Sequence, residues 1–191
     1  FKPNILLESG TGTSTLVIAE TLIQLKKEDP NYNPILISME SLPKWHNLAV
    51  ELLPEKYRDF VEIRLGEREK FEYGMFRGYC HSNIPSKNYD FVFLDGPSYK
   101  DEKGNSSCLD ALKVRIESNA KAVIGVIDTR VTSVFVMQNL FGLNAIRYSD
   151  YKRTCTFRLN KIESYPKFSS KSFSYNLFGK VKIDEKKLLK K

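Results

Sequence analysis

The fold is decided by the stretch Asn4-Ile5-Leu6-Leu7-Glu8-Ser9-Gly10-Thr11-Gly12-Thr13-Ser14-Thr15. A short apolar run ends in the acid Glu8, a glycine-rich turn follows, and an apolar, helix-like segment opens at Thr15. This order predicts a strand, a tight turn and a helix. Glycine at positions 10 and 12 lets the backbone turn sharply and lets a ligand approach where a Cβ would clash. Because the free N–H groups at the start of a helix favour anionic or polar groups, the turn predicts a nucleotide-type cofactor site.

Length and composition indicate one globular domain. The chain has 191 residues, and its hydrophobic content of 41% is enough for a core. No run approaches the roughly 18 apolar residues that can span a bilayer. No signal peptide is visible at Phe1-Lys2-Pro3, so we expect a cytoplasmic protein without membrane association. Because the chain opens on Phe1 rather than Met, we also expect that residues upstream have been removed.

The positive charge is concentrated at one end of the chain. Of the net charge of +7, residues 161–191 carry +6, from nine lysines and three acids. Residues 1–160 are therefore nearly neutral, whereas a body that grips a phosphate backbone is more often basic itself. We expect a domain at 1–160 and a basic C-terminal extension at 161–191, most simply a solvated terminal helix. Nucleic-acid binding through this extension is the alternative.

The cysteines and histidines do not form a recognisable metal site. Cys80, Cys108 and Cys155 are odd in number and far apart, and His46 and His81 supply no clustered partners. We expect the cysteines to be buried, reduced thiols.

Strands and helices alternate along residues 4–160. Strands are expected at 5–7, 35–40, 61–65, 89–94 and 122–127, followed by a hairpin at 145–148 and 154–159. Helices are expected at 15–27, 43–53, 108–118 and about 134–140. Phe71, Met75, Phe76 and Tyr79 stand at roughly helical spacing, which predicts a further helix before Pro85. The pattern predicts an α/β fold with a doubly wound, Rossmann-like sheet of seven strands, mostly parallel with a C-terminal antiparallel hairpin.

Acidic residues follow five of the expected strands. They are Glu8, Glu40, Glu67, Asp95 and Asp128. In doubly wound sheets ligands bind outside the carboxyl ends of the strands, so we expect these carboxylates to converge on one functional edge.

With these features the chain resembles the class I S-adenosylmethionine-dependent methyltransferases over residues 4–160. Glu8-Ser9-Gly10-Thr11-Gly12 is similar to their acid-x-Gly-x-Gly motif, Glu40 to their second-strand acid, and Gly66-Glu67 to the turn after their third strand. Tyr89–Tyr99 is similar to their fourth strand and its loop, and the terminal hairpin to their antiparallel seventh strand. The resemblance implies S-adenosylmethionine as cofactor and methyl transfer as activity.

Within that family, two segments resemble a bacterial subgroup of small-molecule O-methyltransferases. The subgroup has a Gly-x-Ser-Thr turn, matched by Ser14-Thr15 after the glycines, and an Asp-Gly-x-x-Ser-Tyr loop, similar to Asp95-Gly96-Pro97-Ser98-Tyr99. This chain is one residue short in the loop and lacks the His often found there. The resemblance implies a small-molecule acceptor, methylated on oxygen or nitrogen.

The resemblance also implies which residues bind the cofactor. They are Glu8, Gly10, Thr11, Gly12, Glu40, Ser41, Glu67 and Asp95. Glu8 would contact the methionine amino group, directly or through water, by charge-assisted hydrogen bonds. Glu40 would accept both ribose hydroxyls, Glu67 would meet the adenine amino group, and Gly10 and Gly12 would offer bare backbone.

A nicotinamide dinucleotide is the rival cofactor, because its fingerprint also places an acid after the second strand. Three features count against it. Thr15 replaces the third glycine, the acid Glu8 lies close to where a pyrophosphate would bind, and the last two strands form a hairpin instead of a further βαβ unit.

Asp95 is the candidate catalytic base, because it ends the central strand beside the glycine turn. Methyl transfer from a sulfonium mainly requires alignment and deprotonation of the nucleophile, so no nucleophilic triad is needed. In an alternative suggested by the family, Asp95 and Asp128 share Mg²⁺, although Thr129 stands where the metal-dependent enzymes have Asn. Lys100 is a further candidate base.

The acceptor is left open by the sequence. The acid, proline and tyrosine of the Asp95 loop also resemble the Asp/Asn-Pro-Pro-Tyr loop of amino-methylating enzymes, at a different spacing. Tyr99 and Trp45 could stack on an aromatic acceptor. Two further alternatives are a binding module that has kept the fold without catalysis, and a nucleic-acid methyltransferase that uses residues 161–191 as a basic arm.

Overall fold

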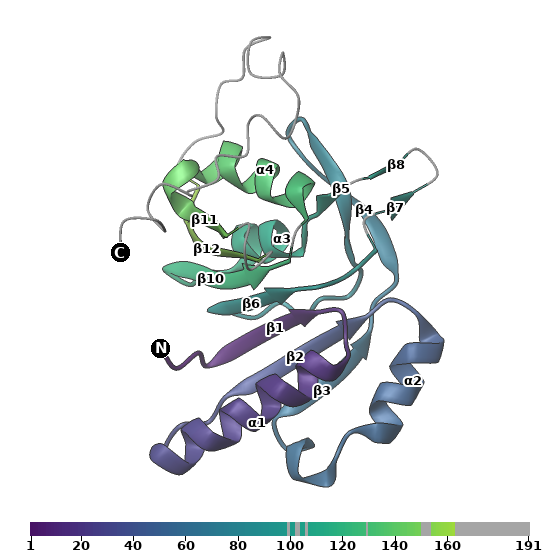
Figure 1. Cartoon of the computed structure of the whole chain (residues 1–191), viewed down its shortest axis with the longest axis vertical. Coiled ribbons are helices and arrows are strands. Elements are labelled where there is room, and N and C mark those ends of the chain that lie inside the picture. The colour runs from purple at the N-terminus through teal and green to yellow at the C-terminus, as the bar shows by residue number, and fades with distance from the viewer. Residues whose placement is uncertain (99, 102–103, 106, 129, 150–153, 163–191) are drawn as a thin grey trace.

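A computed structural model describes residues 1–98, 100–101, 104–105, 107–128, 130–149 and 154–162. Within these ranges, seven strands form one sheet, which runs between two layers of helices (Figure 1). In spatial order its strands are β11 (Ile146–Ser149), β12 (Thr154–Asn160), β10 (Ala122–Ile127), β6 (Phe91–Leu94), β1 (Ile5–Ser9), β2 (Ile35–Glu40) and β3 (Val61–Leu65). The helices are α1 (Thr13–Glu28), α2 (Pro43–Leu52), α3 (Asp110–Glu117) and α4 (Val131–Phe141), with 3₁₀ turns η1 (Glu55–Tyr57) and η2 (Leu143–Ala145).

The strand order confirms the predicted fold class. Strands β3, β2, β1, β6 and β10 pair in parallel, whereas β12 pairs antiparallel with both β10 and β11. Helices α1 and α2 lie on one side of the sheet, and α3 and α4 lie on the other (Figure 1). The chain therefore has a doubly wound, Rossmann-like sheet that ends in an antiparallel hairpin, as the alternation of strands and helices predicted.

Apolar strands explain the centre of this arrangement. Leu7 of β1, Val92 of β6 and Val123 of β10 are completely buried, as expected for parallel strands covered on both faces. The larger core cluster packs against α3 and α4, and a smaller one packs under α1 around Ala19 and Leu22. Helix α2 differs from the other helices because none of its residues is buried.

The helix predicted before Pro85 is wrong. Residues 68–81 form an antiparallel hairpin of β4 (Arg68–Tyr73) and β5 (Phe76–His81), and β5 also pairs with the short strand β9 (Ser107–Cys108). The apolar positions of β5 repeat every second residue, since Phe76 and Cys80 are buried while Arg77 is exposed. This period of two, together with a turn at Gly74 at φ +60°, outweighs the approximate helical spacing. A further pair of short strands is formed by β7 (Lys100–Asp101) and β8 (Gly104–Asn105).

The structure bears only in part on two predictions, the one about membrane association and the one about a domain boundary at residue 160. No helix among the described residues is long and apolar enough to cross a membrane. The proposed basic extension at 161–191 lies almost wholly outside the described residues, so the boundary at residue 160 stays a prediction.

Candidate functional site

The five acids predicted to converge do lie along one edge of the sheet. Because β3, β2, β1, β6 and β10 are parallel neighbours, their carboxyl ends share one edge. Glu8 is the fourth residue of β1, Glu40 ends β2, and Glu67, Asp95 and Asp128 lie within two residues of the ends of β3, β6 and β10. Their surroundings differ greatly, and these surroundings determine what each acid can do.

Glu8 is completely buried, and hydroxyl groups enclose its carboxylate. Oε1 accepts a hydrogen bond from Ser14 at 2.6 Å, and Oε2 accepts from Thr15 at 2.5 Å and from Ser38 at 2.6 Å. Burial raises the pKa of Glu8, although the three hydroxyl donors oppose the rise. A direct contact between this carboxylate and a cofactor ammonium stays a prediction.

Thr15, which stands where a dinucleotide fingerprint has glycine, has a clear local role. Its hydroxyl donates to Glu8 and accepts from the backbone N–H of Gly12 at 3.0 Å. The side chain therefore joins the strand end to the first residues of α1. Thr11 extends the same group of hydroxyls, with its Oγ1 2.7 Å from Ser38 Oγ.

The two glycines of the turn have different roles. Gly10 has φ +97°, and a Cβ built on it would lie 2.9 Å from the backbone nitrogen of Gly96. The side of Gly10 where a Cβ would lie therefore faces the loop after β6, and contact of its backbone with a ligand stays a prediction. Gly12 has nothing within 4 Å of the place where a Cβ would be, so its backbone faces open space that a ligand could occupy.

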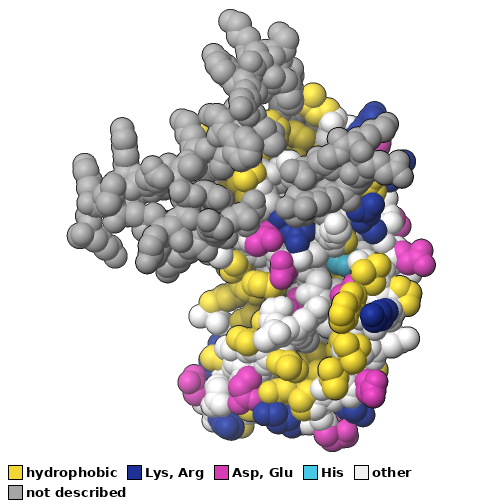
Figure 2. Space-filling model, turned by 45° about the vertical axis from the view of Figure 1, so that its right-hand side comes forward, with side chains coloured by type: hydrophobic (Ala, Val, Ile, Leu, Met, Phe, Trp, Pro, Cys, Tyr) yellow, Lys and Arg dark blue, Asp and Glu magenta, His cyan; other side chains and the backbone are white. Residues whose placement is uncertain are grey.

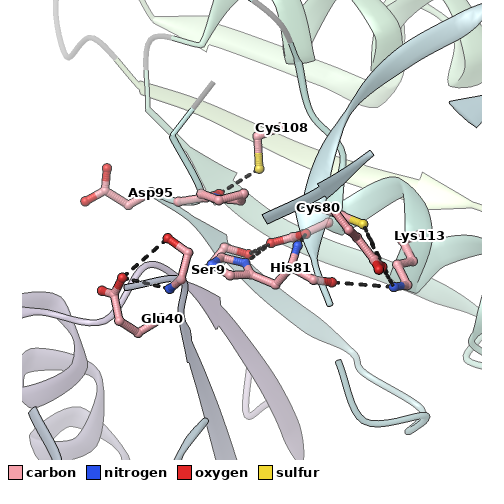
Figure 3. A network of polar contacts seen from close by, with 12 residues as sticks. Ser9, Glu40, Cys80, His81, Asp95, Cys108 and Lys113 are labelled. Carbon is pink, nitrogen blue, oxygen red and sulfur yellow. Dashed lines mark hydrogen bonds and ion pairs between the residues drawn. The ribbon is translucent and has the colours of Figure 1, made fainter. Parts of the chain in front are cut away.

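Glu40 is half-buried and stabilises its own turn. Oε1 accepts the backbone N–H of Ser41 at 2.7 Å and of Leu42 at 2.9 Å. Within the described residues Oε2 has no hydrogen-bond donor. Glu67 is exposed, and its backbone carbonyl accepts the N–H of Ser82 at 2.8 Å. Figure 3 labels Glu40 and marks its hydrogen bonds with dashed lines.

Arg130 joins the two acids that were predicted to bind a metal. It is 7% exposed, and its Nε donates to Asp128 Oδ1 at 2.9 Å. Its Nη1 donates to the carbonyl of Pro97 at 2.7 Å, and Nη2 donates to the carbonyl of Asp95. Nη2 also lies 3.5 Å from the Asp95 carboxylate, which is about half-exposed. The guanidinium thus connects the loops after β6 and β10.

These residues do not fit the predicted Mg²⁺ site. A divalent cation shared by Asp95 and Asp128 would be repelled by the guanidinium of Arg130 that already contacts both acids. No cluster of three or more His, Cys, Asp or Glu residues able to hold a metal occurs in the part of the chain that the structure describes. Burial raises the pKa of Asp128, and the positive charge of Arg130 opposes the rise.

A buried network below the edge was missed in the sequence (Figure 3). Asp110, at the start of α3, is completely buried and accepts from Ser9 Oγ at 2.6 Å and from the His81 N–H at 2.8 Å. Its Oδ2 also lies 2.6 Å from His81 Nδ1, while His81 Nε2 has no partner among the described residues. Because Ser9 donates to the acid and not to the histidine, this is not a nucleophilic triad. The network ties β1 to β5 and α3.

The cysteines are buried and unpaired, as predicted. Cys108 Sγ donates to the Gly96 carbonyl at 2.6 Å, which further fixes the loop that carries Asp95. Burial raises the pKa of Cys80 and of Cys155 to about 12, so neither is prepared to act as a thiolate nucleophile.

Sequence signals existed for some of the residues that were missed. Ser38 is a polar residue inside an otherwise apolar strand, and Arg130 follows Asp128 by two positions. Tyr99 and the side chain of Lys100, both predicted to contribute to the site, lie outside the described part of the structure.

Comparisons with known proteins add little to this picture. No protein family model and no curated protein matches the chain. Among solved structures, the chain is similar to a dimethyladenosine transferase from Plasmodium falciparum, with 13% sequence identity and a TM-score of 0.42. The match covers 93% of this chain and 60% of that one, so the chain spans 60% of the length of its structural neighbour.

Proposed function

We propose that the chain is an S-adenosylmethionine-dependent methyltransferase domain of class I that acts on a hydroxyl or amino group of a small molecule. The proposal depends on one observation above all. The open backbone of Gly12 and the half-buried carboxylate of Glu40 lie at the ends of adjacent parallel strands, where doubly wound sheets bind nucleotide-type ligands.

The geometry of Glu40 supports its role as the ribose-binding acid. Because Oε1 accepts two backbone N–H groups, the carboxylate is held in one orientation. A carboxylate has about four acceptor positions, two on each oxygen, so the two positions of Oε2 can accept two hydroxyl donors. Glu8 contributes its charge from beneath the turn, since the hydroxyls of Ser14 and Thr15 separate it from solvent.

Asp95 is the residue of this edge best suited to act as the base. Its carboxylate is about half-exposed at the end of the central strand, and Arg130 holds both its backbone carbonyl and its side chain. The cofactor supplies an electrophilic methyl group on a sulfonium. Asp95 accepts the proton of the acceptor hydroxyl or amine, and the loop around Gly96 keeps this carboxylate beside the glycine turn.

Calorimetric titration with S-adenosylmethionine and S-adenosylhomocysteine tests the proposal. We expect micromolar binding of both. Glu40→Ala should weaken it about 10- to 100-fold, the equivalent of one lost charge-assisted contact. Glu28→Ala is the matched control, because Glu28 is an exposed acid at the far end of α1.

The same titration, carried out with NAD⁺, tests the nicotinamide dinucleotide as the rival cofactor. Binding of NAD⁺ in place of both sulfur nucleotides would identify a dinucleotide site. A folded chain that binds none of the three would overturn the proposed function, and equal affinities for Glu40→Ala and wild type would overturn the ribose assignment.

A further inference from the structure

A cavity lies beside the glycine turn, on the side of the sheet that carries α1 and α2. Its volume is about 270 Å³. The residues that line it come from the glycine turn, the first helical turn of α1, the helix α2 with the residue that follows it, and the strand β3. They are Thr11, Gly12, Thr13, Thr15, Leu16, Trp45, Leu48, Ala49, Leu52, Leu53 and Ile63.

The cavity exists because α2 does not pack closely on α1. Trp45, Leu48, Ala49 and Leu52 are spaced three or four residues apart, so they share one face of α2. In a closely packed helix such an apolar face would be buried, yet Trp45 is 50% exposed and Leu52 66% exposed. Figure 2 brings this side of the molecule forward and shows hydrophobic side chains gathered on its lower part.

This cavity is separate from the acids of the sheet edge. It shares Thr11 and Gly12 with the proposed cofactor turn, but Glu8, Glu40 and Asp95 do not line it. None of its lining residues is charged. A charged ligand group would lose its hydration among these side chains, so the cavity favours an uncharged ligand. Lys44, whose Nζ lies 5.3 Å from the centroid of the Trp45 ring, is exposed and does not line the cavity.

We propose that this cavity binds a small, uncharged, ring-bearing apolar molecule. The indole of Trp45 provides a flat surface for stacking, and Leu16, Leu48 and Leu52 supply apolar contacts. Thr13 is exposed, and its hydroxyl has no hydrogen-bond partner among the described residues, so it can bind one polar atom of the ligand. Pockets that combine apolar walls with a few polar groups are typical small-molecule sites. The proposal does not depend on methyl transfer.

Trp45 allows a direct test, because it is the only tryptophan of the chain. The probe is 4-nitroanisole, which is uncharged, carries an aromatic ring and quenches indole fluorescence, and 4-nitrobenzoate is its charged analogue. We expect saturable quenching of Trp45 by 4-nitroanisole. With 4-nitrobenzoate we expect only the linear collisional quenching that free N-acetyltryptophanamide shows.

Variants then locate the binding. Ala49→Phe should fill the cavity and weaken 4-nitroanisole binding at least tenfold. Val50→Phe is the matched control, since Val50 is the next residue, is exposed and lies outside the cavity lining. If Ala49→Phe does not fold, Leu52→Asp replaces it, because Leu52 is largely exposed and the new charge lies at the cavity wall.

Three outcomes would overturn the proposal. These are quenching that is linear in 4-nitroanisole, saturable quenching that survives both Ala49→Phe and Leu52→Asp, and saturable quenching of similar affinity by 4-nitrobenzoate. Sedimentation velocity checks the competing occupant. A dimer that Leu52→Asp dissociates, without 4-nitroanisole binding, would assign this surface to a second copy of the chain.

Discussion

The two halves of the sheet edge satisfy their acids in opposite ways. In the glycine-turn half, at the ends of β1, β2 and β3, Glu8 is held by hydroxyl groups and Glu40 by backbone N–H groups. In the arginine half, at the ends of β6 and β10, Asp95 and Asp128 both contact the cation Arg130. Uncharged donors stabilise a carboxylate without cancelling its charge, whereas a guanidinium cancels it.

This difference suggests a division of roles. The glycine-turn half keeps a negative potential, which suits the ammonium and the hydroxyl groups of a cofactor. The arginine half is internally compensated, which fixes Asp95 and makes the edge unsuitable for a divalent cation. The halves meet where Gly10 and Gly96 lie against each other, backbone to backbone.

The largest loss of stability is expected when a side chain is placed at the contact between Gly10 and Gly96. Gly10→Ala would bring a Cβ to within about 3 Å of the backbone of Gly96, at a φ of +97° that L residues rarely adopt. We expect the free energy of unfolding to fall by about 4 kcal/mol, from overpacking and backbone strain together. Urea unfolding followed by circular dichroism measures it.

Gly12→Ala is the matched control for this change. Gly12 has φ 177°, which any residue adopts, and open space where a Cβ would lie. Its stability should stay within about 0.5 kcal/mol of wild type, in the range of ordinary surface substitutions. Equal losses for the two variants would contradict the view that only Gly10 is needed for packing.

A smaller loss is expected when the buried acid of the glycine-turn half is removed. Glu8→Ala leaves the buried hydroxyls of Thr15 and Ser38 and the half-buried hydroxyl of Ser14 without their acceptor. We expect the free energy of unfolding to fall by about 3 kcal/mol, since unsatisfied buried donors cost about 1–3 kcal/mol each and hydroxyls can partly reorient. Glu40→Ala, at a half-buried acid of the same half, should cost less than about 1 kcal/mol in the same measurement.

Most of the fold could be predicted because strand signals are local. The strands at 35–40, 61–65 and 122–127 were predicted with the bounds that the structure gives, since each is an apolar or alternating run closed by a turn or an acid. The hairpin at 68–81 was missed because Phe71, Met75 and Tyr79 stand four positions apart, a spacing that also fits a helix. The turn at Gly74 and the pairing of β5 with β9 decide for the hairpin, and the second of these contacts is not local.

The position of the site could be predicted from the sequence better than the hydrogen-bond partners of its acids. That five acids share an edge follows from strand order alone, but the partner of each acid depends on residues far away in the chain. Ser38 reaches Glu8 across 30 positions, and Arg130 reaches Asp95 across 35. For this reason the sequence could suggest a metal between Asp95 and Asp128 without revealing the arginine that takes its place.

In the arginine half, removal of the guanidinium should leave the negative charges of Asp95 and Asp128 uncompensated. Arg130→Ala removes hydrogen bonds to two carbonyls and leaves Asp95 and Asp128 without a cationic partner among the described residues. We expect a loss of about 2 kcal/mol in the free energy of unfolding, which is moderate because both carboxylates are partly exposed.

Added Mg²⁺ then tests whether Arg130 or a divalent cation compensates Asp95 and Asp128 in the wild-type chain. Millimolar Mg²⁺ should raise the melting temperature of Arg130→Ala, whose facing carboxylates are free to bind it, and should leave wild type unchanged. A similar rise in wild type, reversed by EDTA, would restore the metal hypothesis.

The smallest effect concerns the pH dependence of stability and returns to Glu8, because burial raises its pKa above the ordinary value of 4.5. Below about pH 4.5 the carboxyl is protonated in both the folded and the unfolded chain, so it adds no pH dependence. As the pH rises above that value, the unfolded chain releases the proton first, and the folded state loses relative stability until its own raised pKa is passed. The unfolding free energy of wild type should therefore decline relative to that of Glu8→Gln across this window and run parallel to it at higher pH.

Glu28→Gln, at an exposed acid, should follow wild type throughout. A wild-type chain that instead gains stability over Glu8→Gln as the pH rises would mean that the hydroxyl donors outweigh burial and hold the carboxylate ionised.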